Sequence, residues 1–528
     1  MRLPRVSVLL ALLVGLLSAC GDDDTSADAS VDALSIDAAF TDVASADVRE
    51  SPDARELDAG PGADVPVIDG GGLDAPEVNT IDTPFAAFPE AEGFGAVAVG
   101  GRGGRVIQVT NLNDSGPGSF REACEASGPR TVVFRVGGTI TLESNVEVRE
   151  PFLTIAGQTA PGEGIMLRGN GARNLSMLRI FTNDVIVRHL RFRRGPSTNG
   201  GECNADAIAL LGADRVIIDH VSASWTTDQI MTLWPATNVT IQESIMSEAL
   251  FNSTHSDDCT ADGPLEPHAL GPIVGNESAD VTFYRNVFAN NVGRNPQLSP
   301  RIGGSAEIIN NIIYNACYAV TLSGQGDDSM LANAIGNYIK WGPNSCEGHR
   351  NNILMGGNTR AYLEDNLTPA RNAGDDEWMA SSQFLNRTPA LTEFQSLERF
   401  DTPTARIVSA EETYALVPDT AGAQLVTQEN GEFRVFRDPV DLRSLEDLRS
   451  GTDREGTTGR RLDHPDDVGG WPDVSGGTAY ADEDVDGMPD VWEATHGFDS
   501  ANPTDGEEDR DEDGYTNLEE YLNGTLPG

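Results

Sequence analysis

An asparagine directly before an aliphatic or aromatic pair recurs in the middle of the chain. Successive copies are 25, 26 and 29 residues apart and stand at Asn286, Asn311, Asn337 and Asn366. Repeats of this length are typical of solenoids, in which each unit buries its apolar face only by stacking on its neighbours. The pattern therefore predicts asparagine side chains stacked at the same bend of successive coils.

From Phe88 onward the chain consists of short runs rich in β-branched and aromatic residues, a composition typical of strands. The candidate strands are TVVFRVGGTITL, FLTIAG, VIVRHLRF, RVIIDHVSASW, NVTIQESIM, DVTFYRNVF, AEIINNIIYN, NAIGNYIKW and RAYLEDNL. Together with the repeat they predict an all-β protein built as a parallel β-helix. A β-propeller also repeats short strands, but its blades need about 40–45 residues each.

The first twenty residues, MRLPRVSVLLALLVGLLSAC, have the basic start, short apolar run and small residues of an export signal. Leu-Ser-Ala-Cys20 resembles a bacterial lipobox, which would make Cys20 the lipid-modified first residue of the mature protein. An ordinary signal peptide with an incidental cysteine is the alternative. We therefore expect an exported protein, either an outer-membrane or cell-surface lipoprotein held to the membrane through Cys20, or a secreted one.

The charge of the chain is strongly negative: 36 Lys and Arg stand against 83 Asp and Glu, for a net charge of −47. A protein this acidic would have to build a phosphate-binding face against its own field, so nucleic acid is excluded as a partner. The acidic stretch 21–82, rich in Ala and Asp, has too little apolar surface to fold and is expected to be a disordered linker.

Export places the cysteines in an oxidising compartment. Five cysteines remain after Cys20, so one must stay unpaired if the others pair. The preferred pairs are Cys203 with Cys259 and Cys317 with Cys346, which leaves Cys124 as a buried thiol. The connectivity cannot be deduced from the sequence alone.

Two twelve-residue calcium-loop patterns close the chain, each with carboxylates at positions 1, 3 and 5, Gly at 6, a carbonyl at 7 and Glu at 12. They predict a small, paired EF-hand-like module that binds Ca²⁺. The ligands of the first loop are Asp482, Asp484, Asp486, Met488 and Glu493, and those of the second are Asp509, Asp511, Asp513, Tyr515 and Glu520.

A third group of oxygen ligands lies between two loops that are long for a solenoid, 194–205 and 247–279. Asn204 and Asp206 are close in sequence, and Asp228 falls within the next coil. Carboxylate and amide oxygens suit Ca²⁺. The alternative is that these acids cap turns or pair with nearby arginines, namely Arg188, Arg191 or Arg215. His220 directly follows a buried-looking strand, and we interpret it as structural.

Three sequence segments resemble pectate lyases of polysaccharide lyase family one over about residues 86–370. They are FPEAEGFGAVAVGGRGG, Asp206-Ala-Ile with RVIIDHVSASWTTDQ, and Arg294-Asn-Pro296. The tail also resembles that of bacterial members. The resemblance implies a right-handed parallel β-helix, a Ca²⁺ requirement, and cleavage of polygalacturonate by β-elimination to unsaturated oligogalacturonides.

Carried over residue by residue, the resemblance implies that Arg294 is the catalytic base and that Asn204, Asp206 and Asp228 hold the cleft calcium. Thr232 replaces a frequent second acid, so this site is poorer in charge. Ser299 stands where a second arginine is expected. Arg301, two residues further on, and His268, near a common substrate-binding lysine, are the substrate-binding candidates.

The sequence thus predicts five parts: a lipoprotein signal peptide at 1–20, a linker at 21–82, a catalytic β-helix at 83–385, an extension at 386–478 and the calcium module at 479–528. In the extension, DPVDLRSLEDLRSGT predicts a short helix, and HPDDVGGWPDV predicts extended chain packed on the solenoid. We expect a monomer. The alternative functions are a β-helix glycoside hydrolase acting on pectic polysaccharide and a non-catalytic cell-surface carbohydrate-binding solenoid; the paired aspartates that a hydrolase needs are not found.

Overall fold

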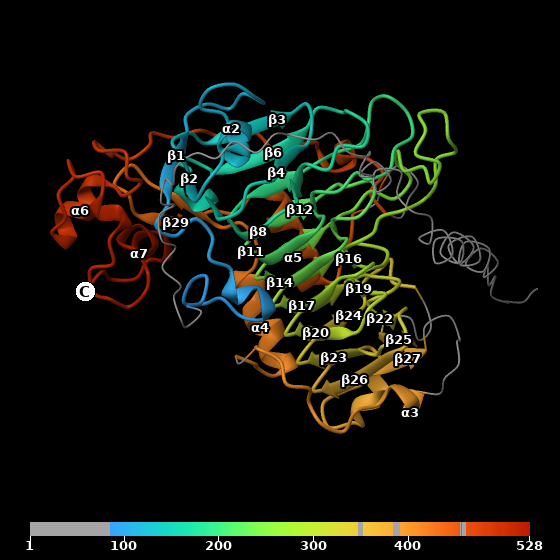
Figure 1. Ribbon diagram of the computed structural model, residues 1–528. Helices are drawn as coiled ribbons and strands as arrows, with labels where there is room; N and C mark the ends of the chain where they lie inside the picture. Colours follow the sequence, from blue (N-terminus) through green and yellow to red (C-terminus); the bar gives the residue numbers. More distant parts are fainter. Residues whose placement is uncertain (1–84, 347–351, 384–390, 405, 455, 457–460) are drawn as a thin grey trace, which may run out of the picture. The chain divides into compact units, whose positions relative to one another are not determined.

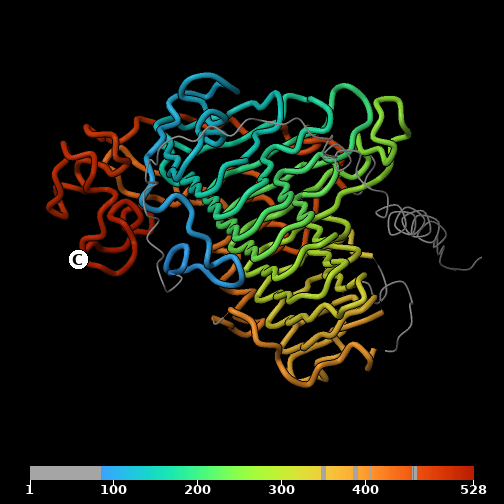
Figure 2. Tube along the Cα trace, viewed as in Figure 1, coloured from blue at the N-terminus to red at the C-terminus, as the bar shows by residue number. Residues whose placement is uncertain are grey.

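The structure, a computed structural model, describes residues 85–346, 352–383, 391–404, 406–454, 456 and 461–528. The signal peptide with Cys20, the linker at 21–82 and the expected boundary at 385 lie outside the described residues. The chain winds through three parallel sheets and, from β2 to β25, visits each sheet once per coil (Figures 1 and 2). This arrangement confirms the parallel β-helix and excludes the propeller, while the right-handed sense of the winding stays a prediction.

The three sheets are named by their strand numbers. The ten-stranded sheet contains β1 (Arg105–Val109), β2 (Arg130–Phe134), β5 (Leu153–Ala156), β8 (Asn183–Arg188), β11 (Ala213–Asp219), β14 (Ala236–Gln242), β17 (Ala279–Tyr284), β20 (Gly304–Ile309), β23 (Met330–Ile335) and β26 (Thr359–Glu364). The eight-stranded sheet contains β3 (Gly138–Leu142), β6 (Ile165–Gly169), β9 (Arg191–Arg193), β12 (Ser222–Ser224), β15 (Ile245–Ser247), β18 (Val287–Ala289), β21 (Ile312–Tyr314) and β24 (Tyr338–Lys340). The nine-stranded sheet contains β4 (Val146–Val148), β7 (Leu178–Ile180), β10 (Ile208–Leu210), β13 (Met231–Leu233), β16 (Ile273–Val274), β19 (Gln297–Leu298), β22 (Val320–Gly324), β25 (Ile353–Gly357) and β27 (Ser381–Gln383).

The predicted asparagine stack is present at the bend between the ten-stranded and eight-stranded sheets. The side-chain oxygen of Asn311 accepts the backbone N–H of Asn286 at 2.9 Å, and that of Asn337 accepts the backbone N–H of Asn311 at 2.9 Å. Asn366 does the same for Asn337, and Asn286 for Ser244. All four asparagines are fully buried. Each one therefore pairs a bend N–H that would otherwise be buried without a partner.

Segments from both ends of the solenoid cover the outer faces of two sheets. Residues 85–98 run across the ten-stranded sheet, where the Gly95 N–H donates to the Thr240 hydroxyl at 2.8 Å, and Phe88 packs near Ile186 and Ile217. The tail packs on the first coils of the same sheet through Met488, Leu518, Tyr521 and Leu522. Helices α4 (Ala410–Thr420) and α5 (Pro439–Ser450) contribute to a core with strands of the eight-stranded sheet.

The remaining elements are short. They are η2 (Phe94–Val97), α2 (Phe120–Glu125), η3 (Gly157–Thr159), η4 (Glu377–Ala380), α3 (Leu391–Phe394), β28 (Leu425–Thr427), β29 (Phe433–Val435), η6 (Pro465–Val468), α6 (Asp490–His496), η7 (Asp505–Glu507) and α7 (Asn517–Asn523). No helix in the described ranges is long and apolar enough to cross a membrane.

Helix α5 confirms the helix predicted in the extension. Asp438 caps it by accepting the Asp441 N–H at 2.9 Å, and both carboxylates also bond the buried Arg193 of β9. The HPDDVGGWPDV prediction was only partly right, because Pro465–Val468 forms a 3₁₀ turn. The turn has a local cause: the His464 and Asp467 side chains bond its N-terminal N–H groups. Trp471 then donates to the carbonyl oxygen of Arg193 at 2.8 Å, so this stretch packs on the solenoid as expected.

Asn311→Ala should lower the free energy of unfolding by about 2 kcal/mol or more, because it leaves the N–H of Asn286 and the carbonyl of Phe283 buried without partners. Urea denaturation measures the change, with Asn113→Ala, an exposed asparagine, as the control. Equal denaturation midpoints for the two variants would show that the stack contributes nothing to stability.

Candidate functional site

The nine-stranded sheet presents a row of outward-facing side chains. In β13, Met231 and Leu233 are fully buried and point into the solenoid, while Thr232 between them is half-buried and points outward. Strand pairing aligns equivalent positions of neighbouring strands, which are Arg179, Ala209, Thr232, Ile273 and Gln297. Arg179, Thr232 and Gln297 of this row are half-buried and can meet an extended ligand, whereas Ala209 and Ile273 are buried.

The chain segments that lead into this sheet are also in register. Gln229, Leu270 and Gly293 form successive parallel bridges, and Ala207 donates its N–H to the carbonyl of Ile230 at 3.1 Å. This stacking brings together Asp206, Asp228 and Arg294 from three separate coils, at the edge where the strands begin. The sequence predicted that these residues belong to one site, and here they lie at one edge of one sheet.

The two carboxylates are almost fully removed from solvent: Asp206 is 3% exposed and Asp228 is 6% exposed. Asp206 accepts the Gln229 N–H at 3.2 Å, and Asp228 accepts the Asn204 N–H at 2.6 Å. Burial and the neighbouring Asp228 together raise the pKa of Asp206 well above its usual range. Two buried carboxylates this close favour a bound cation, and their oxygens suit Ca²⁺.

Asp228 also lies close to a pair of histidines, His255 and His268. The rings of His255 and His268 stack with centroids 3.6 Å apart, and Nε2 of His268 lies 3.2 Å from the Asp228 carboxylate. Burial and then His255 lower the pKa of His268 to about 4. Burial alone would raise the pKa of Asp228, but the histidines and Arg294 hold it below its usual range. The local field is therefore less negative than two aspartates imply.

The two long loops hold this edge in place through covalent and ionic contacts. A disulfide joins Cys203 to Cys259 and so links the loops, as the sequence predicted. Behind it the buried Arg194 guanidinium donates to both oxygens of Glu202, at 2.8 and 2.6 Å. The second predicted disulfide, Cys317–Cys346, is also present. Cys124 is the buried free thiol that the sequence predicted.

The alternative partners proposed for the acids are engaged elsewhere. Arg188 pairs with Asp219 at 2.9 Å, Arg215 pairs with Asp184 at 2.7 Å, and Arg191 donates to backbone carbonyls. Neither Asp206 nor Asp228 therefore relies on these arginines.

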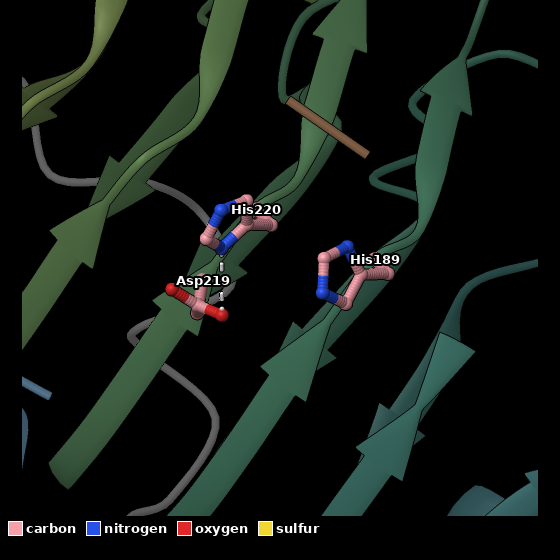
Figure 3. A group of neighbouring side chains, drawn as sticks. All are labelled: His189, Asp219 and His220. Carbon is pink, nitrogen blue, oxygen red and sulfur yellow. Dashed lines mark ion pairs between the residues drawn. The ribbon is translucent and has the colours of Figure 1, made fainter. Parts of the chain in front are cut away.

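Figure 3 shows a second group, His189, Asp219 and His220, at the bend after the ten-stranded sheet. Nδ1 of His220 lies 2.9 Å from Asp219, whose two oxygens also accept from Arg188 and Gln242. Burial would raise the pKa of Asp219, but His220 and Arg188 hold it low. Because protein groups already satisfy this carboxylate, we interpret the group as structural, as the sequence indicated for His220.

The remaining candidates lie at different places. Arg294, which precedes β19, is 3% exposed, whereas Arg301 follows β19 and is exposed. His268 is buried against Asp228, and Ser299 is buried and accepts from Gln297 at 3.2 Å. Substrate contact by Arg301 and His268 stays a prediction.

Two residues of the site had no signal in the sequence reading. Arg179 projects from β7 beside Asp206, and its charge opposes the rise in the pKa of that carboxyl. His255 lies in a long loop with no motif around it. The alternation of apolar and charged residues in Leu-Arg-Ile is a signal that Arg179 faces outward, but this strand is too short to be recognised from the sequence.

The tail contains two further acidic groups. The first combines Asp484, Asp486 and Glu493 of the first loop with Asp505, and the second combines Asp509, Asp511 and Asp513. Burial and mutual repulsion raise the pKa of Asp486 to about 7 and that of Glu493 to about 8. Asp482, predicted as a ligand, is not in the first group. Its carboxylate accepts from Gln108 of β1 at 2.9 Å.

The chain is similar in sequence to curated fungal proteins. It is 36% identical over 453 residues to a protein named probable pectate lyase C from Aspergillus flavus, covering 84% of this chain and 94% of the relative. The same name belongs to a relative from Emericella nidulans that is 35% identical over 460 residues, with the same coverage. No protein-family model matches the chain.

Solved structures of similar proteins are more distant. The pectate lyase of Bacillus sp. N165 in complex with trigalacturonate is 14% identical with a TM-score of 0.37, covering 63% of this chain and 98% of its own. The cedar pollen allergen jun a 1 is 16% identical with a TM-score of 0.38, covering 63% of this chain and 92% of its own.

Thr232→Asp should tighten calcium binding at the edge of the nine-stranded sheet by about tenfold or more, because it adds a carboxylate beside Asp206. Isothermal titration calorimetry of the full chain measures the affinity. Thr141→Asp adds the same charge at an exposed position of β3 and serves as the control. An affinity that does not differ between the two variants would contradict a calcium site next to Thr232.

Proposed function

The chain belongs to the pectate lyase family of polysaccharide lyases, and we propose that it cleaves polygalacturonate by β-elimination with Arg294 as the base. The observation that carries this proposal is the meeting of Asp206, Asp228 and Arg294 at one edge of an open sheet. Carboxylates that hold a cation and an arginine that meets the substrate are the groups that this chemistry requires.

The substrate is a linear polymer with one carboxylate per sugar, so it needs an extended surface with spaced cations. The outward row of the nine-stranded sheet has this form, with Arg179 at one side of Thr232 and Gln297 at the other. We assign Arg179 to binding of a galacturonate carboxylate. Arg301, exposed beyond the end of β19, is the candidate for a neighbouring sugar.

The reaction begins at C5 of a galacturonate, where the proton is α to a carboxylate. Arg294 takes this proton, the C5–H electrons form the C4–C5 double bond, and the C4–O bond breaks. The leaving oxygen keeps the electron pair and receives a proton from solvent. Free arginine has a pKa above about 12, so transfer needs a transiently neutral guanidine, and alkaline conditions favour it.

Asn204, Asp206 and Asp228 are the residues proposed to hold calcium in the cleft. When bound, Ca²⁺ neutralises the substrate carboxylate and stabilises the second negative charge that develops on it. The two buried carboxylates fit such an ion, because burial makes their charged forms costly unless a cation is bound. His268, against Asp228, orients that carboxylate in the proposed site.

The other parts of the chain are assigned from their residues. We propose that 83–385 is the catalytic β-helix, that 386–478 is an extension that packs on it, and that the loops of 479–528 bind Ca²⁺. The two disulfides accord with export. Attachment to a membrane through Cys20, a linker at 21–82 and a monomeric state remain proposals from the sequence. Labelling with a radioactive fatty acid, lost in Cys20→Ser, tests the anchor.

Arg294→Ala should abolish formation of unsaturated product from polygalacturonate at saturating calcium, because the group that accepts the C5 proton is gone. Ultraviolet absorbance of the product measures the activity, and calcium titration checks that the Asp206 and Asp228 site still binds. A variant that binds calcium and keeps more than a few per cent of the activity would remove Arg294 from the role of base.

Arg179→Ala should raise KM for polygalacturonate by about tenfold and leave kcat little changed, because Arg179 is assigned to binding a galacturonate carboxylate and takes no part in the transfer of the C5 proton. Arg105→Ala removes an exposed arginine of the ten-stranded sheet and should not change KM. A fall in kcat with no change in KM would instead place Arg179 in the chemical step.

A further inference from the structure

Four carboxylates from two segments of the tail converge on one point. Their ligand oxygens all lie within 4.8 Å of one another, and they belong to Asp484, Asp486, Glu493 and Asp505. The first three are positions 3, 5 and 12 of the first calcium loop. Asp505 belongs to neither loop: it begins η7, in the stretch between Glu493 and the second loop.

These carboxylates point into the group with oxygens that no protein donor meets. Glu493 is fully buried, and neither of its carboxylate oxygens has a hydrogen-bond partner. One oxygen each of Asp486 and Asp505, both about nineteen-twentieths buried, is also unpartnered. Buried carboxylate oxygens without donors are costly unless a cation takes the place of the donors.

The backbone of η7 also approaches this group closely. A side chain at Gly506 would place its Cβ 2.6 Å from an oxygen of Asp486, so the backbone of this turn passes close to that carboxylate. The other Asp505 oxygen accepts the Asp499 N–H at 3.2 Å, and the Asp505 carbonyl accepts from Asn517 of α7 at 2.6 Å. Asp505 is thus fixed in position by both halves of the tail.

We propose that Asp505 is a ligand of the first tail calcium ion, together with Asp484, Asp486 and Glu493, and that this ion joins the two calcium loops into one unit. The inference rests on the calcium loops proposed above and goes beyond their motif. A hard divalent cation of the size of Ca²⁺ accepts six to eight such oxygens.

The first motif residue, Asp482, contacts the solenoid. Its carboxylate accepts from Gln108 and lies 3.5 Å from Arg135, whose guanidinium stacks over Tyr480 at 4.3 Å. The calcium site of the first loop is therefore next to the contact through which Asp482 holds the tail on the first coils. The three aspartates of the second group are exposed, unlike the largely buried carboxylates of the first, so the second group should bind calcium more weakly.

Calcium titration of the full chain by calorimetry tests the role of Asp505. Asp505→Asn should weaken the tighter class of tail sites by about tenfold or more and leave the weaker class unchanged. Glu507→Gln removes one charge from the same short turn outside the group and should match the wild type. Terbium luminescence lifetimes in light and heavy water should show about one additional bound water in Asp505→Asn.

Equal affinity and equal hydration in Asp505→Asn and Glu507→Gln would overturn the inference while leaving the calcium loops intact. Equal calcium affinity in Glu493→Gln and the wild type would instead overturn the calcium loop itself. If Asp505→Asn does not fold, Asp505→Glu is the second variant. A ligand role for Asp505 predicts that the carboxylate of this variant restores folding and stabilisation by calcium. A variant that folds without calcium-dependent stabilisation, or does not fold, would contradict the ligand role.

Discussion

The buried hydrogen bonds between successive asparagines hold the register on which the rest of the structure depends. Asn286, Asn311 and Asn337 each pair with the next coil through side chain and backbone, so neighbouring coils cannot slip without leaving buried polar groups unpaired. Residues that are distant in sequence are adjacent only because this register holds. Asp206, Asp228 and Arg294 come from different coils, and the parallel bridges that join Gln229, Leu270 and Gly293 hold those coils in register next to the site.

The three sheets have different roles because different segments cover them. Residues 85–98 and the tail lie on the ten-stranded sheet, and α4 and α5 lie on the eight-stranded sheet. On the nine-stranded sheet, Arg179, Thr232 and Gln297 of the outward row are half-buried, and the acidic site lies at the edge where the strands begin. A polymer can bind along such a face without entering a pocket, which suits cleavage of a long acidic polysaccharide.

The sequence predicted most strands of two sheets, though not β1 or β6, together with the asparagine stack, both disulfides and helix α5, since each of these leaves a composition or spacing signal. It did not predict the nine-stranded sheet, because strands such as Ile273–Val274 are too short to alternate visibly. Arg179, on that sheet, was missed for the same reason. Asp505 was missed because it joins the first loop from outside the motif, a contact that only the folded tail makes.

The central claim is that the edge formed by Asp206, Asp228 and Arg294 breaks the glycosidic bond by elimination, without adding water. Mass spectrometry of the products from a defined oligogalacturonate tests it most directly. Elimination predicts product masses that sum to that of the substrate, with one unsaturated product, and cleavage that stops when calcium is chelated. Product masses that sum to that of the substrate plus one water would contradict the claim and assign hydrolysis to this site.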